Sequence, residues 1–134
     1  MQNDGAQPEA AVALAKEVKA FGLLDGLLLN AGQLLFSSSA GSTAEAFDTR
    51  IIMCEAAVLQ MAALSLLQDG VSVVVSSLTA AYEGASVAAL YAASKSAQLV
   101  LVCYWATEFA SRRIRVNDLV PGSIDCNFLL SMPK

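Results

Sequence analysis

A tyrosine and a lysine, Tyr91 and Lys95, stand four positions apart near the start of a segment with strong helical character. Because about four residues make one helical turn, both side chains are expected on the same face of the helix. An ammonium beside a phenol favours the phenolate and lowers the tyrosine pKa from its reference value of ~10. The pair could therefore exchange protons near neutral pH, although the same spacing also fits a packed ring beside a solvated charge.

Three short apolar runs predict β-strands, and longer helical segments separate them. The strands are predicted at residues 25–30, 71–77 and 114–120, and the helices at 8–21, 43–68 and 90–111. Loops are predicted at 33–42 and 78–88 and from residue 121 to the end. This alternation indicates βαβ units, with a parallel sheet and helices on both of its faces.

Polar or turn-forming residues stand at the carboxyl ends of these three strands. They are, in chain order, Asn30, Ser77 and Pro121-Gly122. In open parallel sheets, ligands bind outside the carboxyl ends of the strands. We therefore expect these residues and the Tyr91–Lys95 pair to form one site at a single edge of the sheet.

The composition narrows the function. The net charge of −4 and the pI near 4.6 argue against nucleic-acid binding, which requires basic clusters. The absence of histidine removes Ser-His-Asp and Cys-His catalysis and most transition-metal sites, so no metal is expected. Three cysteines without zinc spacing predict reduced thiols. The most apolar stretch, Ile51 to Leu67, is interrupted by polar residues, and the N-terminus lacks a signal-peptide pattern. A cytoplasmic protein without a membrane partner is predicted.

The ordered motifs resemble those of the short-chain dehydrogenase/reductase family, over nearly the whole chain. They are Asn30-Ala31-Gly32, Ser77, Tyr91-x-x-x-Lys95, and Arg115-Val-Asn117 followed by Pro121-Gly122. The resemblance implies an α/β, Rossmann-like, doubly wound parallel sheet. It also implies an NAD(P)-dependent oxidoreductase that moves hydride between nicotinamide and an alcohol or carbonyl substrate. The sequence decides neither the substrate nor NAD versus NADP.

The glycine-rich cofactor motif of the family is missing. Only 29 residues precede Asn30, and they contain no such glycine cluster. We therefore expect residues 1–134 to be a single partial Rossmann-like domain, incomplete at both ends. Two hypotheses follow: part of a working oxidoreductase, or a non-catalytic truncated remnant that packs against a full-length relative. By resemblance, a homo-oligomer is expected through helices 43–68 and 90–111.

The resemblance assigns three catalytic roles. Tyr91 would be the general acid/base, and Lys95 would lower its pKa and bind the nicotinamide ribose. Ser77 would hold the substrate oxygen and is favoured over Ser76, although it lies fourteen residues before Tyr91, one more than the commonest family spacing. The alternative for both serines is that their hydroxyls cap a strand end.

The resemblance also assigns cofactor contacts and two departures. Besides Tyr91 and Lys95, the cofactor-binding residues would be Asn30, Ala31, Gly32, Pro121, Gly122 and Ile124. Cys54 stands where the family often has a fourth catalytic residue, asparagine, and Cys126 where it often has threonine. A thiol is a poor substitute for an amide, which weakens the expected proton relay.

Overall fold

The computed structural model describes residues 8–30, 39–44, 65–84 and 88–124. Its α-helices are α1 (Pro8–Lys19) and α3 (Ala89–Glu108). Its strands are β1 (Leu24–Leu29), β2 (Leu67–Ser76) and β3 (Arg115–Leu119). Three short 3₁₀ helices accompany them: η1 (Ser39–Gly41), η3 (Thr79–Ala81) and η4 (Ala110–Arg112). The predicted helix 43–68 falls mostly outside the described residues.

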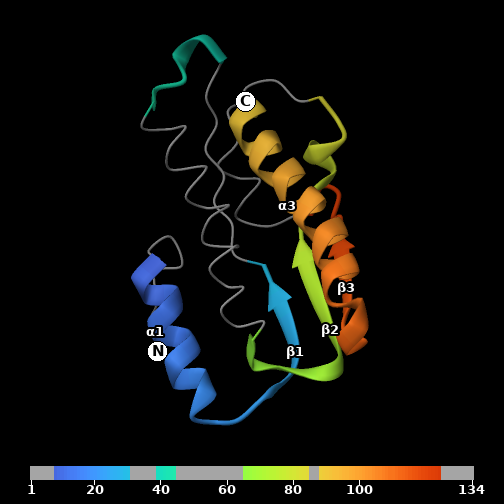
Figure 1. Cartoon of the computed structure of the whole chain (residues 1–134). Coiled ribbons are helices and arrows are strands. Elements are labelled where there is room, and N and C mark those ends of the chain that lie inside the picture. Colours follow the sequence, from blue (N-terminus) through green and yellow to red (C-terminus); the bar gives the residue numbers. More distant parts are fainter. Residues whose placement is uncertain (1–7, 31–38, 45–64, 85–87, 125–134) are drawn as a thin grey trace.

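The three strands form a parallel sheet in the order β1-β2-β3, as the alternating pattern predicted (Figure 1). Val73 in the middle strand is paired with Leu27 on one side and Val116 on the other. Residues that are paired across neighbouring strands point to the same face of the sheet, so these three side chains share one face. The Rossmann-like fold class expected from the sequence is therefore present in the part of the chain that the structure describes.

The beginning of β2 differs from the prediction. Leu67 already pairs with Leu24, whereas regular pairing resumes only at Gly26 with Ser72, so the middle strand bulges between these points. Gly70 takes a φ of +83°, a conformation that glycine adopts without steric cost. The predicted helix end at residue 68 is therefore wrong, because the strand begins four residues before the predicted start at 71.

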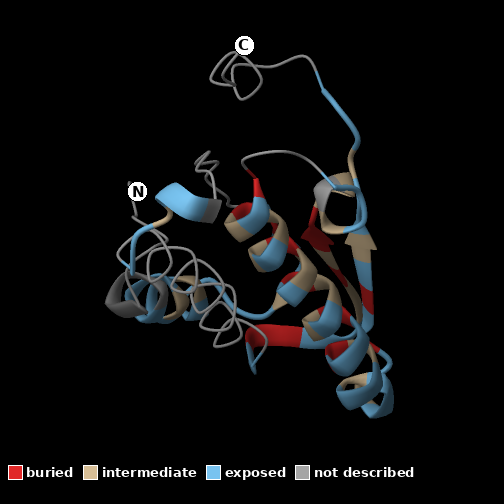
Figure 2. Cartoon of the chain, turned by 90° about the horizontal axis from the view of Figure 1, so that it is seen from above, coloured by how far each residue is buried: buried red, intermediate tan, exposed pale blue. Residues whose placement is uncertain are grey.

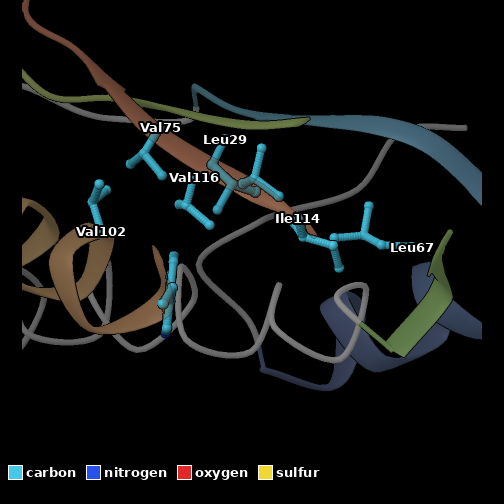
Figure 3. Packing of buried hydrophobic residues seen from close by; sticks show 8 residues of the cluster. Leu29, Leu67, Val75, Val102, Ile114 and Val116 are labelled. Carbon is cyan, nitrogen blue, oxygen red and sulfur yellow. The ribbon is translucent and has the colours of Figure 1, made fainter. Parts of the chain in front are cut away.

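The core lies between α3 and one face of the sheet. Figure 2 shows the buried side of this helix turned toward the strands, and Figure 3 shows the packed side chains. The buried cluster consists of Leu29, Leu67, Val73, Val75, Val102, Trp105, Ile114 and Val116. On the opposite face of the sheet, Leu28 and Leu119 remain 62% and 54% exposed. The described core is therefore one-sided.

A tight turn joins α3 to β3. The helix ends at Glu108, and after η4 the chain turns at Arg113, whose φ of 57° lies in the left-handed region. Arg112 donates to Asp69 over 2.9 Å and to the carbonyl oxygen of Leu67, which ties this turn to the start of β2. No helix in the described ranges is long and apolar enough to cross a membrane.

Candidate active site

The carboxyl ends of the three strands meet at one edge of the sheet, as the sequence predicted. The parallel register places Leu29 beside Val75 and Ser76 beside Leu119. Beyond the strands, the backbone N–H of Ser77 donates to the carbonyl oxygen of Leu119 over 3.0 Å. The N–H of Thr79 likewise donates to the carbonyl oxygen of Pro121 over 3.1 Å. The loops that follow β2 and β3 are thus fastened together at this edge.

Lys95 is a buried cation at this edge, with only 5% of its surface exposed. Its Nζ donates to the backbone carbonyl of Ser76 over 2.9 Å and to Oε1 of Gln98 over 3.1 Å. Burying an ammonium is costly unless its donors are satisfied, and these two acceptors offset part of that cost. The amine is therefore held in place at the end of β2.

Tyr91 lies one turn earlier on α3 and is equally buried. The Nζ of Lys95 is 6.0 Å from the centroid of its ring. The four-residue spacing thus brings the two side chains together on the face of α3 that is turned toward the sheet. The alternative interpretation, a packed ring beside an exposed and solvated lysine, does not hold, because Lys95 is buried and hydrogen-bonded.

Ser77 is 3% exposed, and its hydroxyl is engaged. Its Oγ donates to Oδ2 of Asp118 over 2.6 Å. This distance is typical of a strong hydrogen bond to an ionised acceptor. Ser76 differs, because its carbonyl oxygen accepts from Lys95. The two neighbouring serines therefore make different contacts at the site.

Gln98 and Asp118 are the hydrogen-bond partners of Lys95 and Ser77, and neither had a predicted role. Gln98 follows Lys95 by three positions on a helix, so its place on the same face could have been read from the spacing. Asp118 is two residues after the buried Val116 on β3, and alternation places it on the core face. Its contact with Ser77, 41 residues away, depends on the strand register and has no local sequence signal.

The predicted cofactor residues are placed only in part. Asn30 directly follows β1 and is exposed, and Pro121, Gly122 and Ile124 follow β3. A side chain added at Gly122 would meet nothing within 4 Å, so the space beside this backbone is open. Ala31, Gly32, Cys54 and Cys126 lie outside the described residues. Within the described ranges, no group of three or more acidic, cysteine or histidine residues could hold a metal ion.

Comparison with known proteins decides the family. The sequence model of the family described as "Enoyl-(Acyl carrier protein) reductase" matches residues 1–133. The chain belongs to the short-chain dehydrogenase/reductase family. The description is that of the family model and leaves the reaction of this particular member open.

Relatives of this short-chain dehydrogenase/reductase support the assignment. The chain is 31% identical to versicolorin reductase 1 of Aspergillus parasiticus over 139 residues, covering all of this chain and 53% of that protein. A short-chain dehydrogenase from Burkholderia cenocepacia, solved in complex with NADP, has a TM-score of 0.89 at 31% identity and is matched over 54% of its chain. A blue fluorescent protein from a metagenomic library, in complex with NADPH, has the same TM-score at 27% identity and is matched over 53% of its chain. The chain spans about half the length of these relatives.

Proposed function

We propose that this chain carries the catalytic part of an NADP(H)-dependent oxidoreductase that interconverts an alcohol and a carbonyl compound. The observation that supports the proposal most strongly is the buried Lys95, hydrogen-bonded to the end of β2 and 6.0 Å from the Tyr91 ring. A lysine that packs only for stability normally keeps its amine in water. A buried amine beside a phenol favours the phenolate and so supports proton exchange by Tyr91.

In this proposal Tyr91 handles the proton. It gives a proton to the substrate oxygen during reduction and removes the hydroxyl proton during oxidation. Lys95 favours the phenolate through its charge, which lowers the pKa of Tyr91. Ser77, which directly follows β2, positions the substrate oxygen. All three come from the carboxyl edge of the sheet or from the helix that packs against it.

The residues at this edge fit a dinucleotide. The amine of Lys95 can hydrogen-bond ribose hydroxyls, and the open space beside Gly122 admits a flat ring close to the backbone. Asn30, Ala31, Gly32, Pro121 and Ile124 are the further contacts that we propose. The bound cofactor would supply or accept the hydride. NADP is favoured because the similar structures from Burkholderia cenocepacia and the metagenomic library hold NADP or NADPH.

Substitution of Tyr91 by phenylalanine tests this proposal. Phenylalanine keeps the buried ring but removes the proton donor, so we expect hydride transfer to fall by about 10²–10⁴-fold while the circular dichroism spectrum is unchanged. The measurement is NADPH oxidation with a panel of ketones and quinones, compared between the wild type and Tyr91→Phe.

Tyr82→Phe is the matched control, because Tyr82 is exposed in the loop after β2. Its activity should equal that of the wild type. Loss of a general acid/base lowers the rate by about 10²–10⁴-fold. A Tyr91→Phe variant that keeps more than about a tenth of the wild-type activity would therefore contradict the mechanism. A wild-type chain that neither binds nor oxidises the cofactor would favour the non-catalytic alternative.

We also propose that the protein self-associates through α3. A second row of residues on this helix faces away from the sheet and is exposed: Ala93, Ala97, Val100, Tyr104 and Thr107. Their spacing of four and three residues makes one continuous stripe. The small and apolar side chains of this stripe allow close approach of another helix. The other helix of the expected interface, 43–68, lies mostly outside the described residues.

A further inference from the structure

The hydroxyl of Ser77 is already committed to a partner within the protein. Its proton lies toward Oδ2 of Asp118, at a distance of 2.6 Å between the oxygens. Both residues come from the carboxyl ends of neighbouring strands, Ser77 after β2 and Asp118 in β3. The register fixes their relation, because Val75 pairs with Asp118 and Ser77 is two residues farther along on the same face.

The carboxylate depends on this contact. The second oxygen of Asp118, Oδ1, is cut off from solvent and has no hydrogen-bond partner among the residues that the structure describes. An unsatisfied acceptor that is removed from water costs free energy, so losing the Ser77 proton as well would leave both oxygens without a donor. The Ser77–Asp118 bond is therefore expected to persist when substrate arrives.

A serine hydroxyl has one proton to donate and two lone pairs that can accept. Once the proton is held by Asp118, Ser77 can offer only lone pairs to a neighbouring group. An alcohol can donate its O–H to such an acceptor. A carbonyl oxygen has no proton to donate, so its lone pairs and those of the Ser77 oxygen repel each other.

We propose that Asp118 is a positioning residue that holds the Ser77 proton, so that Ser77 meets the substrate oxygen as a hydrogen-bond acceptor. This inference rests on the proposed function, because it assumes that Ser77 contacts the substrate oxygen. Its consequence is a preference of the site for the alcohol over the matching ketone while Tyr91 is protonated, because the alcohol then accepts from Tyr91 and donates its single O–H to Ser77. In oxidation, the same O–H turns to the Tyr91 phenolate, which removes the proton. Tyr91 is then left as the donor to a carbonyl oxygen.

The test compares the binding of cyclohexanol and cyclohexanone by ligand-observed NMR. The alcohol is titrated in the presence of NADPH and the ketone in the presence of NADP⁺, so that neither mixture can react. The quantity of interest is the ratio of the ketone Kd to the alcohol Kd. We expect Asp118→Ala to lower this ratio about tenfold, the size of one hydrogen bond gained or lost, because the freed proton can then reach the ketone.

Two further variants distinguish the effect of the Ser77 proton from an effect of changed packing around Asp118. In a Ser77→Ala background, Asp118→Ala should leave the ratio unchanged. Ser77→Ala alone should weaken the alcohol and not the ketone, because it removes an acceptor, and this arm stands even if Asp118→Ala fails to fold. Asp25→Ala is the control: it removes the same charge from an exposed site near the start of β1 and should leave the ratio unchanged.

The outcomes separate the inference from the function on which it rests. Equal losses of alcohol and ketone in Asp118→Ala would mean a structural role and overturn the inference. So would a Ser77→Ala variant that weakens the ketone instead, since Ser77 would then be a donor to the substrate. Failure of the wild type to bind NADPH and NADP⁺ in these mixtures would overturn the proposed function and the inference together.

Discussion

Lys95 illustrates how a charged side chain is kept buried at the site. Its amine lies between a backbone carbonyl at the end of β2 and the amide oxygen of Gln98 on the same helix. Both of these acceptors are neutral groups. This arrangement holds the cation 6.0 Å from the centroid of the Tyr91 ring.

Replacing Lys95 by methionine is predicted to change the pH dependence of activity and cofactor binding together. Loss of the positive charge raises the pKa of Tyr91, so the rise of alcohol oxidation with pH should shift to higher pH. The same change removes the donor proposed for the ribose hydroxyls, and the Kd for NADPH should increase. Rate profiles over pH and calorimetric titration of NADPH measure the two effects.

Lys16→Met provides the matched control for this prediction, because Lys16 is exposed on α1. It removes one positive charge with the same change of side chain and should alter neither quantity. If Lys95→Met likewise altered neither, the lysine would have only a structural role.

Local geometry is enough to place part of the candidate site from the sequence. Tyr91 and Lys95 follow from helical spacing, and the strand end places both Ser76 and Ser77, of which the family resemblance favours Ser77. Asp118 could not be predicted in the same way. Its contact with Ser77 requires the register of β2 against β3, and a shift of one residue would turn its side chain to the opposite face.

At the scale of the elements, α3 combines the site and the core on one face. Its buried residues recur at intervals of four and three: Tyr91, Lys95, Gln98, Val102 and Trp105. The first half of this row is polar and lies at the carboxyl edge of the sheet, whereas the second half is apolar and packs on the strands. The packing of Val102 and Trp105 against the strands therefore fixes the position of α3 along the sheet, and with it the position of Tyr91 and Lys95 at the strand ends.

A matched pair of valines on α3 tests this packing. Val102 is 8% exposed and Val100 is 57% exposed on the same helix. Val102→Ala removes two buried methyl groups, each worth about 0.8 kcal/mol, and leaves a cavity. We expect it to lower the free energy of unfolding by about 2 kcal/mol more than Val100→Ala. Urea denaturation of both variants, at a protein concentration at which the chain is monomeric, gives the difference. Equal stabilities would contradict the burial of Val102 in the core.

The order and type of the described elements were predictable, but one boundary was not. Apolar runs and helical spacing predicted β1, α3 and β3 to within a few residues. The early start of β2 was missed because Gln68, Asp69 and Gly70 have low strand propensity. They are held in the strand by contacts from distant parts of the chain, including the bond between Arg112 and Asp69.

At the scale of the molecule, exposed apolar residues lie on two surfaces in the part of the chain that the structure describes. One is the outward stripe of α3, where Tyr104 is 71% exposed beside Val100. The other is the second face of the sheet, with Leu28 and Leu119. Exposed apolar residues gathered on one face often mark an interface. The two surfaces predict association by different routes, and single substitutions can separate them.

We expect Tyr104→Asp to weaken self-association. Aromatic residues at the centre of an interface often contribute most of its binding energy, and a carboxylate there adds a desolvation cost. The dissociation constant of the oligomer, measured by sedimentation equilibrium, should rise at least about tenfold, which corresponds to about 1.4 kcal/mol. Leu28→Asp is the comparison variant, because it places the same charge on the second face of the sheet. If Leu28→Asp dissociated the oligomer and Tyr104→Asp did not, the interface would be the sheet and the proposed role of α3 would be wrong.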